Sequence, residues 1–292
     1  MKRVILTPNP YRDKGFHTVR TAADILRKAG MEPKICLPFE VEKSFELPKD
    51  IRFCRLEREL PNAELIVCFG GDGTILHTAK AATRNGIPIL GVNIGTMGFM
   101  AELESHELPQ LARLANDDYH IENRMMLDVS VTRGGEEIFH DISLNDVVIT
   151  KGAVARIVTV SVKCDGIQAM ECGGDGVIVS TPTGSTAYNL SAGGPIVEPD
   201  AHNLIITPIC AHDMVSRCMV ASDRRTVTLS LSRNARRNAS LSVDGGKTVR
   251  ISVGDTVTVR KSDCETKLLR LNDRSFYDVV NTKFNLVKDA TR

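Results

Sequence analysis

The sequence has almost no net charge, no paired cysteine motif and no long apolar run. Its 37 Lys and Arg residues nearly balance 36 Asp and Glu residues, giving a formal charge of +1. Such a chain is not typical of proteins that bind nucleic acid or an anionic membrane surface. No run approaches the roughly 20 apolar residues of a membrane span, and the N-terminus lacks the apolar stretch of a signal peptide. We therefore expect no nucleic-acid partner and no membrane partner.

None of the eight cysteines forms a CxxC pair. Several stand in apolar runs such as Leu65–Phe69, where a small side chain can be buried. This pattern argues against a zinc site and favours free thiols in a reducing compartment. We predict a cytoplasmic protein without metal-ligating residues.

Two patterns of hydrophobicity divide the 292 residues, a length that suits two ordinary domains. Residues 1–120 alternate short apolar runs with helical patterns, which predicts an α/β domain with a doubly wound, largely parallel sheet. Residues 121–265 contain strand-like segments separated by Gly, Asn or Asp, which predicts a mainly antiparallel β domain. Residues 266–292 lose that pattern and are a candidate to complete the first domain.

The expected elements are short. In the first part we predict strands over Val4–Thr7, Lys34–Leu37, Leu65–Phe69 and Ile87–Val92, and helices over Thr18–Ala29, Thr74–Arg84 and Leu108–Leu114. In the second part we predict strands over Leu127–Thr132, Ile142–Thr150, Ile157–Lys163, Val177–Thr181, Val227–Leu231, Leu241–Val243, Val249–Val253 and Thr256–Arg260. The string Gly173-Gly174-Asp175-Gly176 is interpreted as a turn before one of these strands.

A glycine-rich loop, Gly70-Gly71-Asp72-Gly73-Thr74, separates a predicted buried strand from a predicted helix. Ligands usually bind at the carboxyl ends of parallel strands. Glycines let backbone N–H groups approach phosphate oxygens, and a helix N-terminus favours negative charge. The alternative is a tight strand-to-helix turn in which Asp72 or Thr74 caps the helix.

Asp72 helps to choose between these interpretations. A carboxylate is electrostatically unfavourable in a loop that only holds phosphate. It is useful if it accepts a proton from an attacking hydroxyl or helps to hold Mg²⁺. The spacing fits neither the Walker A loop nor the glycine loop of protein kinases.

A second cluster is richer in hydroxyl groups. Asp175-Gly176 precedes Ser180–Pro195, where Ser, Thr and Tyr alternate with Gly, Pro and Ala. Hydroxyls and an accessible backbone suit phosphate and ribose contacts, and small residues leave room for a flat ring near Tyr188. The alternative is a capped loop that starts a short helix.

Together these motifs resemble those of the NAD kinases. They stand in the order seen in that family: Gly70–Thr74, Leu144-Asn145-Asp146, Asp175-Gly176, Ser180–Pro195, Thr207-Pro208-Ile209-Cys210 and Val243-Asp244-Gly245. The glycine-aspartate motif also occurs in phosphofructokinases and lipid kinases. The Thr181–Pro195 block is far more specific, and the similarity extends over most of the chain.

The resemblance implies transfer of a phosphate from ATP to the 2′-hydroxyl of the adenosine ribose of NAD, giving NADP. ATP would bring Mg²⁺ or another divalent cation, and NAD would be the acceptor substrate. Asp72 would be the catalytic carboxylate. Members of the family are commonly homo-oligomers, and we expect the same here.

The resemblance also implies a set of binding residues. Asn145 and Asp146 would hold ribose or adenine groups. His77 could equally lie on the polar face of its helix, and Arg156 could equally be a solvated strand residue. The complete implied set is Gly70, Gly71, Gly73, Thr74, His77, Asn145, Asp146, Arg156, Gly173, Asp175, Thr186, Ala187, Tyr188, Asn189, Leu190, Ser191 and Cys210.

Three departures from the family's usual sequence concern affinity and specificity more than reaction class. Asp146 stands where the family usually has Glu, and its reach is shorter by roughly one bond length. Gly246 stands where a Gln is usual, so a side-chain amide is lost. The stretch Ala211–Cys218 lacks the prolines that are usual at its two ends.

Two other functions stay open. A lipid or sugar kinase could share the glycine loop, although no amphipathic membrane helix is evident. A dinucleotide sensor could bind NAD(H) or NADP(H) with weak or no turnover, and the departures at Asp146 and Gly246 would favour it. The sequence does not distinguish ATP from polyphosphate as donor, or NAD from NADH as acceptor.

Overall fold

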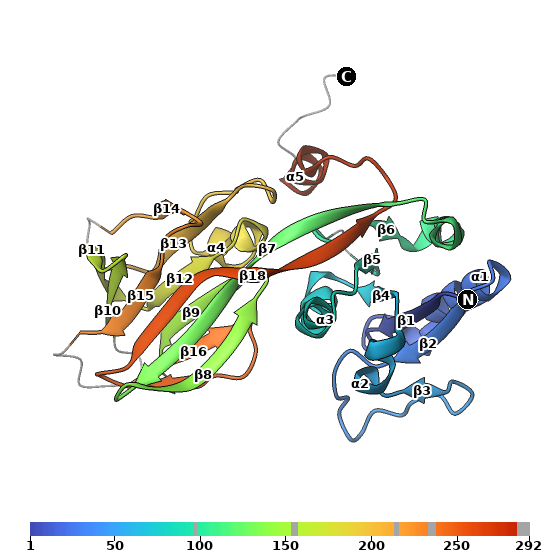
Figure 1. Ribbon diagram of the computed structural model, residues 1–292, viewed down its shortest axis with the longest axis horizontal. Coiled ribbons are helices and arrows are strands. Elements are labelled where there is room, and N and C mark those ends of the chain that lie inside the picture. Colours follow the sequence, from blue (N-terminus) through green and yellow to red (C-terminus); the bar gives the residue numbers. More distant parts are fainter. Residues whose placement is uncertain (96–97, 153–156, 213–215, 233–237, 285–292) are drawn as a thin grey trace. The chain divides into compact units, whose positions relative to one another are not determined.

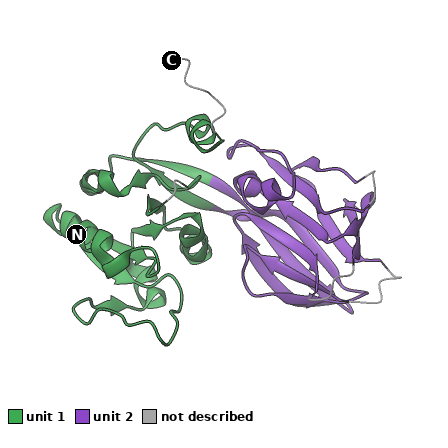
Figure 2. Cartoon of the chain, turned by 180° about the vertical axis from the view of Figure 1, so that it is seen from behind, with its two compact units in different colours: residues 1–123, 266–292 green, residues 124–265 purple. Residues whose placement is uncertain are grey.

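The computed structural model describes residues 1–95, 98–152, 157–212, 216–232 and 238–284 (Figure 1). Contacts divide the chain into unit 1, residues 1–123 with 266–292, and unit 2, residues 124–265 (Figure 2). Unit 1 has a parallel sheet with helices and unit 2 has antiparallel sheets, so the predicted fold class is confirmed. Among the helices in the described ranges, none has the length and apolarity that a membrane crossing requires.

The sheet of unit 1 has the strand order β3-β2-β1-β4-β5, and all of these strands are parallel. The strands are β1 (Arg3–Pro8), β2 (Glu32–Cys36), β3 (Phe53–Cys54), β4 (Leu65–Gly70) and β5 (Ile89–Asn93). The short β6 (Leu103–Glu104) and the end of β18 (Thr256–Arg270) pair with β5. β4 is buried at every position, as expected for a central strand of a parallel sheet with both faces covered.

Several helices accompany this sheet. They are η1 (Lys14–Phe16), α1 (His17–Lys28), α2 (Leu56–Glu59), η2 (Leu60–Asn62), α3 (Asp72–Arg84), η3 (Ser105–Asn116) and α5 (Phe276–Phe284). Leu65, Val67 and Phe69, alternate side chains of β4, share one core with α1 and η3. Because alternate side chains of a strand point to opposite faces, the remaining side chains of β4 point to the other face of the sheet. The helix α3 contacts β4 and covers that face.

The strand order of unit 1 reverses between β1 and β4. β2 and β3 lie on one side of β1, and β4 and β5 lie on the other. The loops after β1 and β4 are joined there: the Asn9 N–H donates to the Phe69 carbonyl at 2.8 Å, and Asn9 Nδ2 donates to Thr74 Oγ1 at 3.1 Å. Open α/β sheets bind ligands outside the carboxyl ends of strands at such a point. The glycine loop therefore occupies a typical ligand position.

Unit 2 contains two antiparallel sheets. The first has the order β14 (Met219–Ser222), β13 (Asn203–Ile209), β12 (Gly176–Ser180), β9 (Asp146–Lys151), β16 (Ala239–Val243) and β17 (Val249–Ile251). The second includes β11 (Ile167–Gly174), β10 (Val158–Cys164), β15 (Val227–Leu231), β18, β7 (His120–Arg133) and β8 (Glu136–Ser143). Side chains such as Ile149 and Val177 of the first sheet share one core with Val129 and Val160 of the second. The short helices η4 (Thr183–Thr186) and α4 (Tyr188–Ser191) follow β12.

The predicted single strand over Ile142–Thr150 is wrong, because β8 ends at Ser143 and β9 begins at Asp146. The N–H groups of Leu144 and Asn145 donate to the carboxylate of Asp244 instead of to a neighbouring strand. The strand ends there, and the chain passes from one sheet to the other.

The predicted turn at Gly173–Gly176 is also wrong. β11 runs to Gly174 and β12 begins at Gly176, so Asp175 alone separates strands of the two sheets. β11 is an edge strand whose residues are mostly exposed or half-buried, and its sequence lacks the regular apolar alternation that predicts a strand. β13 was missed as well, since Pro208 lies inside it and proline argues against a central strand.

Candidate active site

The glycine loop of unit 1 leads directly into α3, which begins at Asp72 with Gly71 as its N-cap. The alternative in which Asp72 or Thr74 caps this helix is wrong, since both lie inside its first turn. Thr74 is buried and its hydroxyl accepts the Asn9 amide. A Cβ placed on Gly71 or Gly73 would meet no atom within 4 Å. The loop backbone is therefore open to an approaching ligand.

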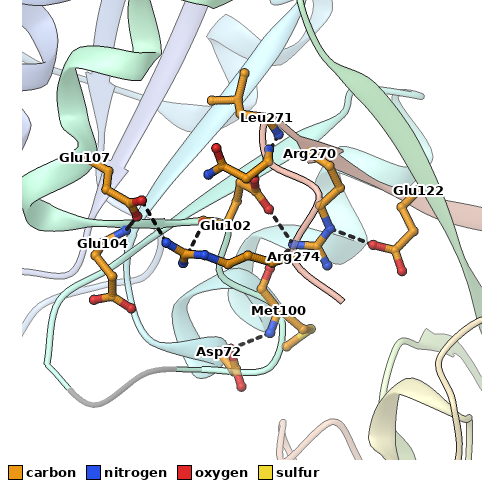
Figure 3. A network of polar contacts seen from close by, with 10 residues as sticks. Asp72, Met100, Glu102, Glu104, Glu107, Glu122, Arg270, Leu271 and Arg274 are labelled. Carbon is orange, nitrogen blue, oxygen red and sulfur yellow. Dashed lines mark hydrogen bonds and ion pairs between the residues drawn. The ribbon is translucent and has the colours of Figure 1, made fainter. Parts of the chain in front are cut away.

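The Asp72 carboxylate is held by two backbone N–H groups from the segment after β5. Oδ2 accepts the Phe99 N–H at 2.8 Å, and Oδ1 accepts the Met100 N–H at 3.0 Å (Figure 3). The segment can come this close because residue 98 is glycine: a Cβ there would lie 2.1 Å from Asp72 Oδ1. An ionised carboxylate offers about four acceptor positions, so this half-buried group can accept a further donor such as a hydroxyl.

His77 is exposed on α3, and its ring lies 4.9 Å from the ring of Phe39. An aromatic neighbour suits either an ordinary surface packing role or a ligand contact. The role of His77 in binding therefore stays a prediction. Arg156 lies outside the described residues.

In unit 2 the Leu144-Asn145-Asp146 motif is ordered by the carboxylate of Asp244, which directly follows β16, the strand that pairs with β9. Asp244 Oδ1 accepts the N–H groups of Asn145 at 2.8 Å and Asp146 at 3.1 Å, and Oδ2 accepts that of Leu144 at 2.9 Å. Ser143 Oγ donates to the same carboxylate at 2.6 Å. Sequence reasoning noted Asp244 only as part of a family motif. Its role depends on a contact across 98 to 101 residues, which no local pattern signals.

Asp146 is buried beside this carboxylate, with only 6% of its surface exposed. Burial, and then the negative charge of Asp244, raise the pKa of Asp146 to about 7. A carboxyl group with that pKa can donate or accept a hydrogen bond near neutral pH. The departure from Glu to Asp therefore still leaves a group suited to a hydroxyl or a base edge.

The Ser180–Pro195 block packs directly onto this motif. Thr181 Oγ1 donates to the Leu144 carbonyl at 2.6 Å, and the Thr181 N–H donates to the Asn145 carbonyl at 2.9 Å. Gly184 is required by the closeness of the two segments, because a Cβ there would lie 2.2 Å from the Asn145 carbonyl oxygen. Within the described residues, the buried Oδ1 of Asn145 has no hydrogen-bond partner. The protein itself therefore leaves this buried acceptor unsatisfied.

Asn189 holds the same block together from inside. It is fully buried; its Nδ2 donates to the carbonyls of Ser185 and Pro195 at 2.9 Å, and its Oδ1 accepts Thr207 Oγ1 at 2.6 Å. Its side chain thus orders the block, while its neighbours face outward to different degrees. Tyr188 and Ser191 are exposed, and Thr186, Ala187 and Leu190 are half-buried.

Tyr188 connects the remaining candidates of unit 2. Although Tyr188 is exposed, the partial burial of its side chain raises its pKa, and the nearby Cys210, Asp175 and Asp146 add to this effect. Asp175 also forms an ion pair with Lys151, with Nζ 2.6 Å from Oδ1. The Gly173 carbonyl accepts the N–H of His212, two residues after Cys210, at 2.8 Å. The structure therefore gathers Asp146, Gly173, Asp175, Tyr188 and Cys210 within one part of unit 2.

Comparison with known proteins places both groups of candidates inside a family. Residues 40–119 match the family model described as "ATP-NAD kinase N-terminal domain", and residues 144–271 match "ATP-NAD kinase C-terminal domain". A protein of Ruminiclostridium cellulolyticum named NAD kinase is 35% identical over 288 residues, covering 97% of this chain and 98% of that protein. One of Natranaerobius thermophilus, also named NAD kinase, is 44% identical over 222 residues, or 76% and 77% of the two chains.

Solved structures agree in fold. The structure of a yeast NADH kinase complexed with NADH superposes with a TM-score of 0.84 at 22% identity, covering 100% of this chain and 90% of that one. An NAD kinase from Archaeoglobus fulgidus in complex with ATP gives a TM-score of 0.75 at 24% identity, covering 98% and 100%.

The pKa of Asp146 predicts a pH-dependent stability that Asp146→Asn removes. Because its pKa rises from 3.8 to about 7 on folding, the folded state binds the proton more tightly than the unfolded state. Its contribution is fully present below about pH 4 and is lost as the pH rises to about 7. Between pH 5 and 8, the free energy of unfolding of the wild type should fall by about 2 kcal/mol relative to Asp146→Asn.

Urea unfolding followed by far-UV circular dichroism checks this prediction, since the chain has no Trp for fluorescence. Asp263→Asn, which changes an exposed carboxylate of the same unit, is the matched control and should show no such divergence. A constant difference between wild type and Asp146→Asn across this pH range would contradict the raised pKa.

Asp244→Asn should destabilise unit 2. Asn, like Asp, tolerates the left-handed backbone conformation of position 244 (φ 51°). It replaces an acceptor oxygen by an NH₂ group facing an N–H donor, and this should lower the free energy of unfolding by about 1–3 kcal/mol. The same urea titration measures it, with Asp263→Asn again as control. Equal stability of Asp244→Asn and wild type would show that Asp244 does not order the motif.

Proposed function

The chain belongs to the NAD kinase family and is an enzyme of that class, and we propose that it transfers the γ-phosphate of ATP to the 2′-hydroxyl of the adenosine ribose of NAD. The product would be NADP, with Asp72 accepting the proton of the attacking hydroxyl. Phosphoryl transfer depends mainly on positioning and on neutralising charge, so the protein contributes little covalent chemistry.

The observation that carries the catalytic role of Asp72 is the fixed position of its carboxylate. Two backbone N–H groups orient it, and the open backbone of Gly71 and Gly73 flanks it. A carboxylate held in this way needs no reorganisation when a hydroxyl approaches. The amino end of α3 favours the negative charge of phosphate oxygens, and we propose that Gly70, Gly71, Gly73 and Thr74 contact phosphates there.

We propose that the candidates of unit 2 bind the dinucleotide. The unpaired Oδ1 of Asn145 and the carboxyl of Asp146, with its pKa of about 7, suit hydroxyl and amino groups of a nucleoside. Exposed Tyr188 offers a ring against which a base can stack. In this proposal Asp175, Gly173, Cys210 and the rest of Thr186–Ser191 complete the contacts, and Arg156 and His77 remain candidates for phosphate.

A divalent cation fits this proposal as a companion of ATP. The described residues include no group of three or more His, Cys, Asp or Glu side chains that could hold a metal. Mg²⁺ usually keeps several waters and binds through substrate phosphates, so ATP itself would supply most of its ligands and Asp72 would stay free to accept the proton. When bound, the ion would neutralise phosphate charge.

Family membership favours this reaction over a lipid or sugar kinase and over a sensor without turnover. We also propose a homo-oligomer, as the resemblance implies, and action in the cytoplasm. The eight cysteines are all free in the structure, and free thiols persist in a reducing compartment.

The proposed reaction predicts that purified protein with Mg-ATP and NAD forms NADP. A dehydrogenase specific for NADP detects the product, and parallel reactions replace NAD with NADH, diacylglycerol or fructose phosphate, and ATP with polyphosphate. NADP formation without lipid or sugar phosphorylation is the expected result. Tight NADP binding by calorimetry together with no NADP formation would support the sensor instead.

Asp72→Asn should lower kcat by about 10²–10⁴-fold, the usual contribution of a general base. The variant should stay folded but lose about 1–3 kcal/mol of stability, since its NH₂ group faces one of the two N–H donors. The coupled assay gives kcat and circular dichroism verifies folding. Asp24→Asn, an exposed carboxylate of α1 paired with Arg27, is the control that should keep full turnover. Unchanged kcat in Asp72→Asn would remove Asp72 from the mechanism.

A further inference from the structure

A buried ion pair lies behind the segment that holds Asp72. The guanidinium of Arg270, at the end of β18, lies 3.3 Å from the carboxylate of Glu102 (Figure 3). Their side chains are only 12% and 3% exposed. Buried charges persist where they are paired and hydrogen-bonded, and both groups of this pair make further hydrogen bonds.

Glu102 fixes the chain that follows Arg270. Its Oε1 accepts the N–H groups of Leu271 at 2.9 Å and Asn272 at 2.7 Å, while its own N–H donates to the Gly91 carbonyl of β5 at 2.8 Å. β18 also pairs with β5 through Leu268 and Ile89. The backbone around Arg270 is therefore attached to the parallel sheet of unit 1 from two directions.

Arg270 in turn reaches the residue that holds Asp72. Its Nη1 donates to the Met100 carbonyl at 3.1 Å, and its Nε donates to Glu122 Oε2 at 2.6 Å (Figure 3). The N–H of the same Met100 donates to Asp72 Oδ1 (Figure 3). Met100 thus connects the guanidinium with the candidate catalytic carboxylate: its carbonyl accepts from Arg270, and its N–H donates to Asp72.

From this geometry we infer that Arg270, supported by Glu102, is a positioning residue for Asp72. The inference rests on the proposed function, in which Asp72 accepts the hydroxyl proton. The N–H and the carbonyl of Met100 belong to different peptide planes. Arg270 therefore acts by fixing the position of the backbone around Met100 and not by polarising its N–H. The guanidinium suits this role because its planar fork can serve several acceptors at once, whereas the ammonium of Lys is a single point charge.

A double-mutant cycle tests the inference. Arg270→Lys keeps the charge beside Glu102 but not the fork, and we expect kcat to fall by about 10–100-fold, since a misplacement of about 1 Å can cost about 100-fold. KM for ATP and NAD should stay within about threefold, because the substrate contacts are elsewhere. In the Asp72→Asn background the same substitution should change kcat by less than about twofold, since the group it positions is gone.

Enzymatic cycling of NADP amplifies the signal enough to read the residual turnover of Asp72→Asn. Arg113→Lys is the matched control: Arg113 donates to the Leu271 carbonyl at 2.6 Å and pairs with Asp118, and within the described ranges no hydrogen bond joins it to the segment that holds Asp72. It should leave kcat unchanged. If Arg270→Lys fails to fold by circular dichroism, Glu102→Gln replaces it. That variant loses the ion pair, keeps an oxygen acceptor for Leu271 and Asn272, and should lower kcat by about tenfold with the same non-additivity.

The possible failures are distinguishable. Full turnover of Asp72→Asn would refute the catalytic role of Asp72 and, with it, the positioning role of Arg270, whereas the absence of NADP formation by the wild type would refute the proposed function itself. Loss of turnover in Asp72→Asn together with wild-type kcat in Arg270→Lys or Glu102→Gln would overturn only the positioning role. An equal loss of kcat in the wild-type and Asp72→Asn backgrounds would also overturn the positioning role, since it would indicate general structural damage.

Discussion

The hydrogen bonds between the Asp72 carboxylate and the N–H groups of Phe99 and Met100 are the constraint on which unit 1 and its chemistry depend. They place a charged side chain in a fixed orientation at the carboxyl end of the parallel sheet, where the strand order reverses. Gly98 permits this contact because any side chain there would displace the carboxylate. In the proposed mechanism the carboxylate is therefore positioned for phosphoryl transfer before any substrate binds.

Carboxylates accept backbone N–H groups in the same way at other places in the chain. Asp244 collects the N–H groups of the Asn145-Asp146 motif, and Glu102 collects those of Leu271 and Asn272. In each case a carboxylate accepts donors from a segment far away in the sequence, where no strand or helix could satisfy them. Charge-assisted hydrogen bonds of this kind are stronger than neutral ones, so these carboxylates help to order irregular segments of the chain.

Much of this could be predicted from the sequence, and the rest could not for physical reasons. The apolar run at Leu65–Phe69 followed by Gly and Asp identified both the buried strand and the candidate carboxylate, since both depend on local chemistry. The break between β8 and β9 and the end of β18 at Arg270 depend on distant partners. Asp244 and Arg270 carry no local signal, because an isolated acid or base resembles any solvated surface residue.

A crystal structure of the protein with bound NAD tests the role of Asp72 most directly, because the proposed proton transfer joins one pair of atoms. The account predicts that the 2′-oxygen of the adenosine ribose lies within hydrogen-bond distance of a carboxylate oxygen of Asp72, about 2.5–3.0 Å, while the N–H groups of Phe99 and Met100 still hold that carboxylate. A 2′-oxygen that contacts a different proton acceptor, with Asp72 directed elsewhere, would contradict the account.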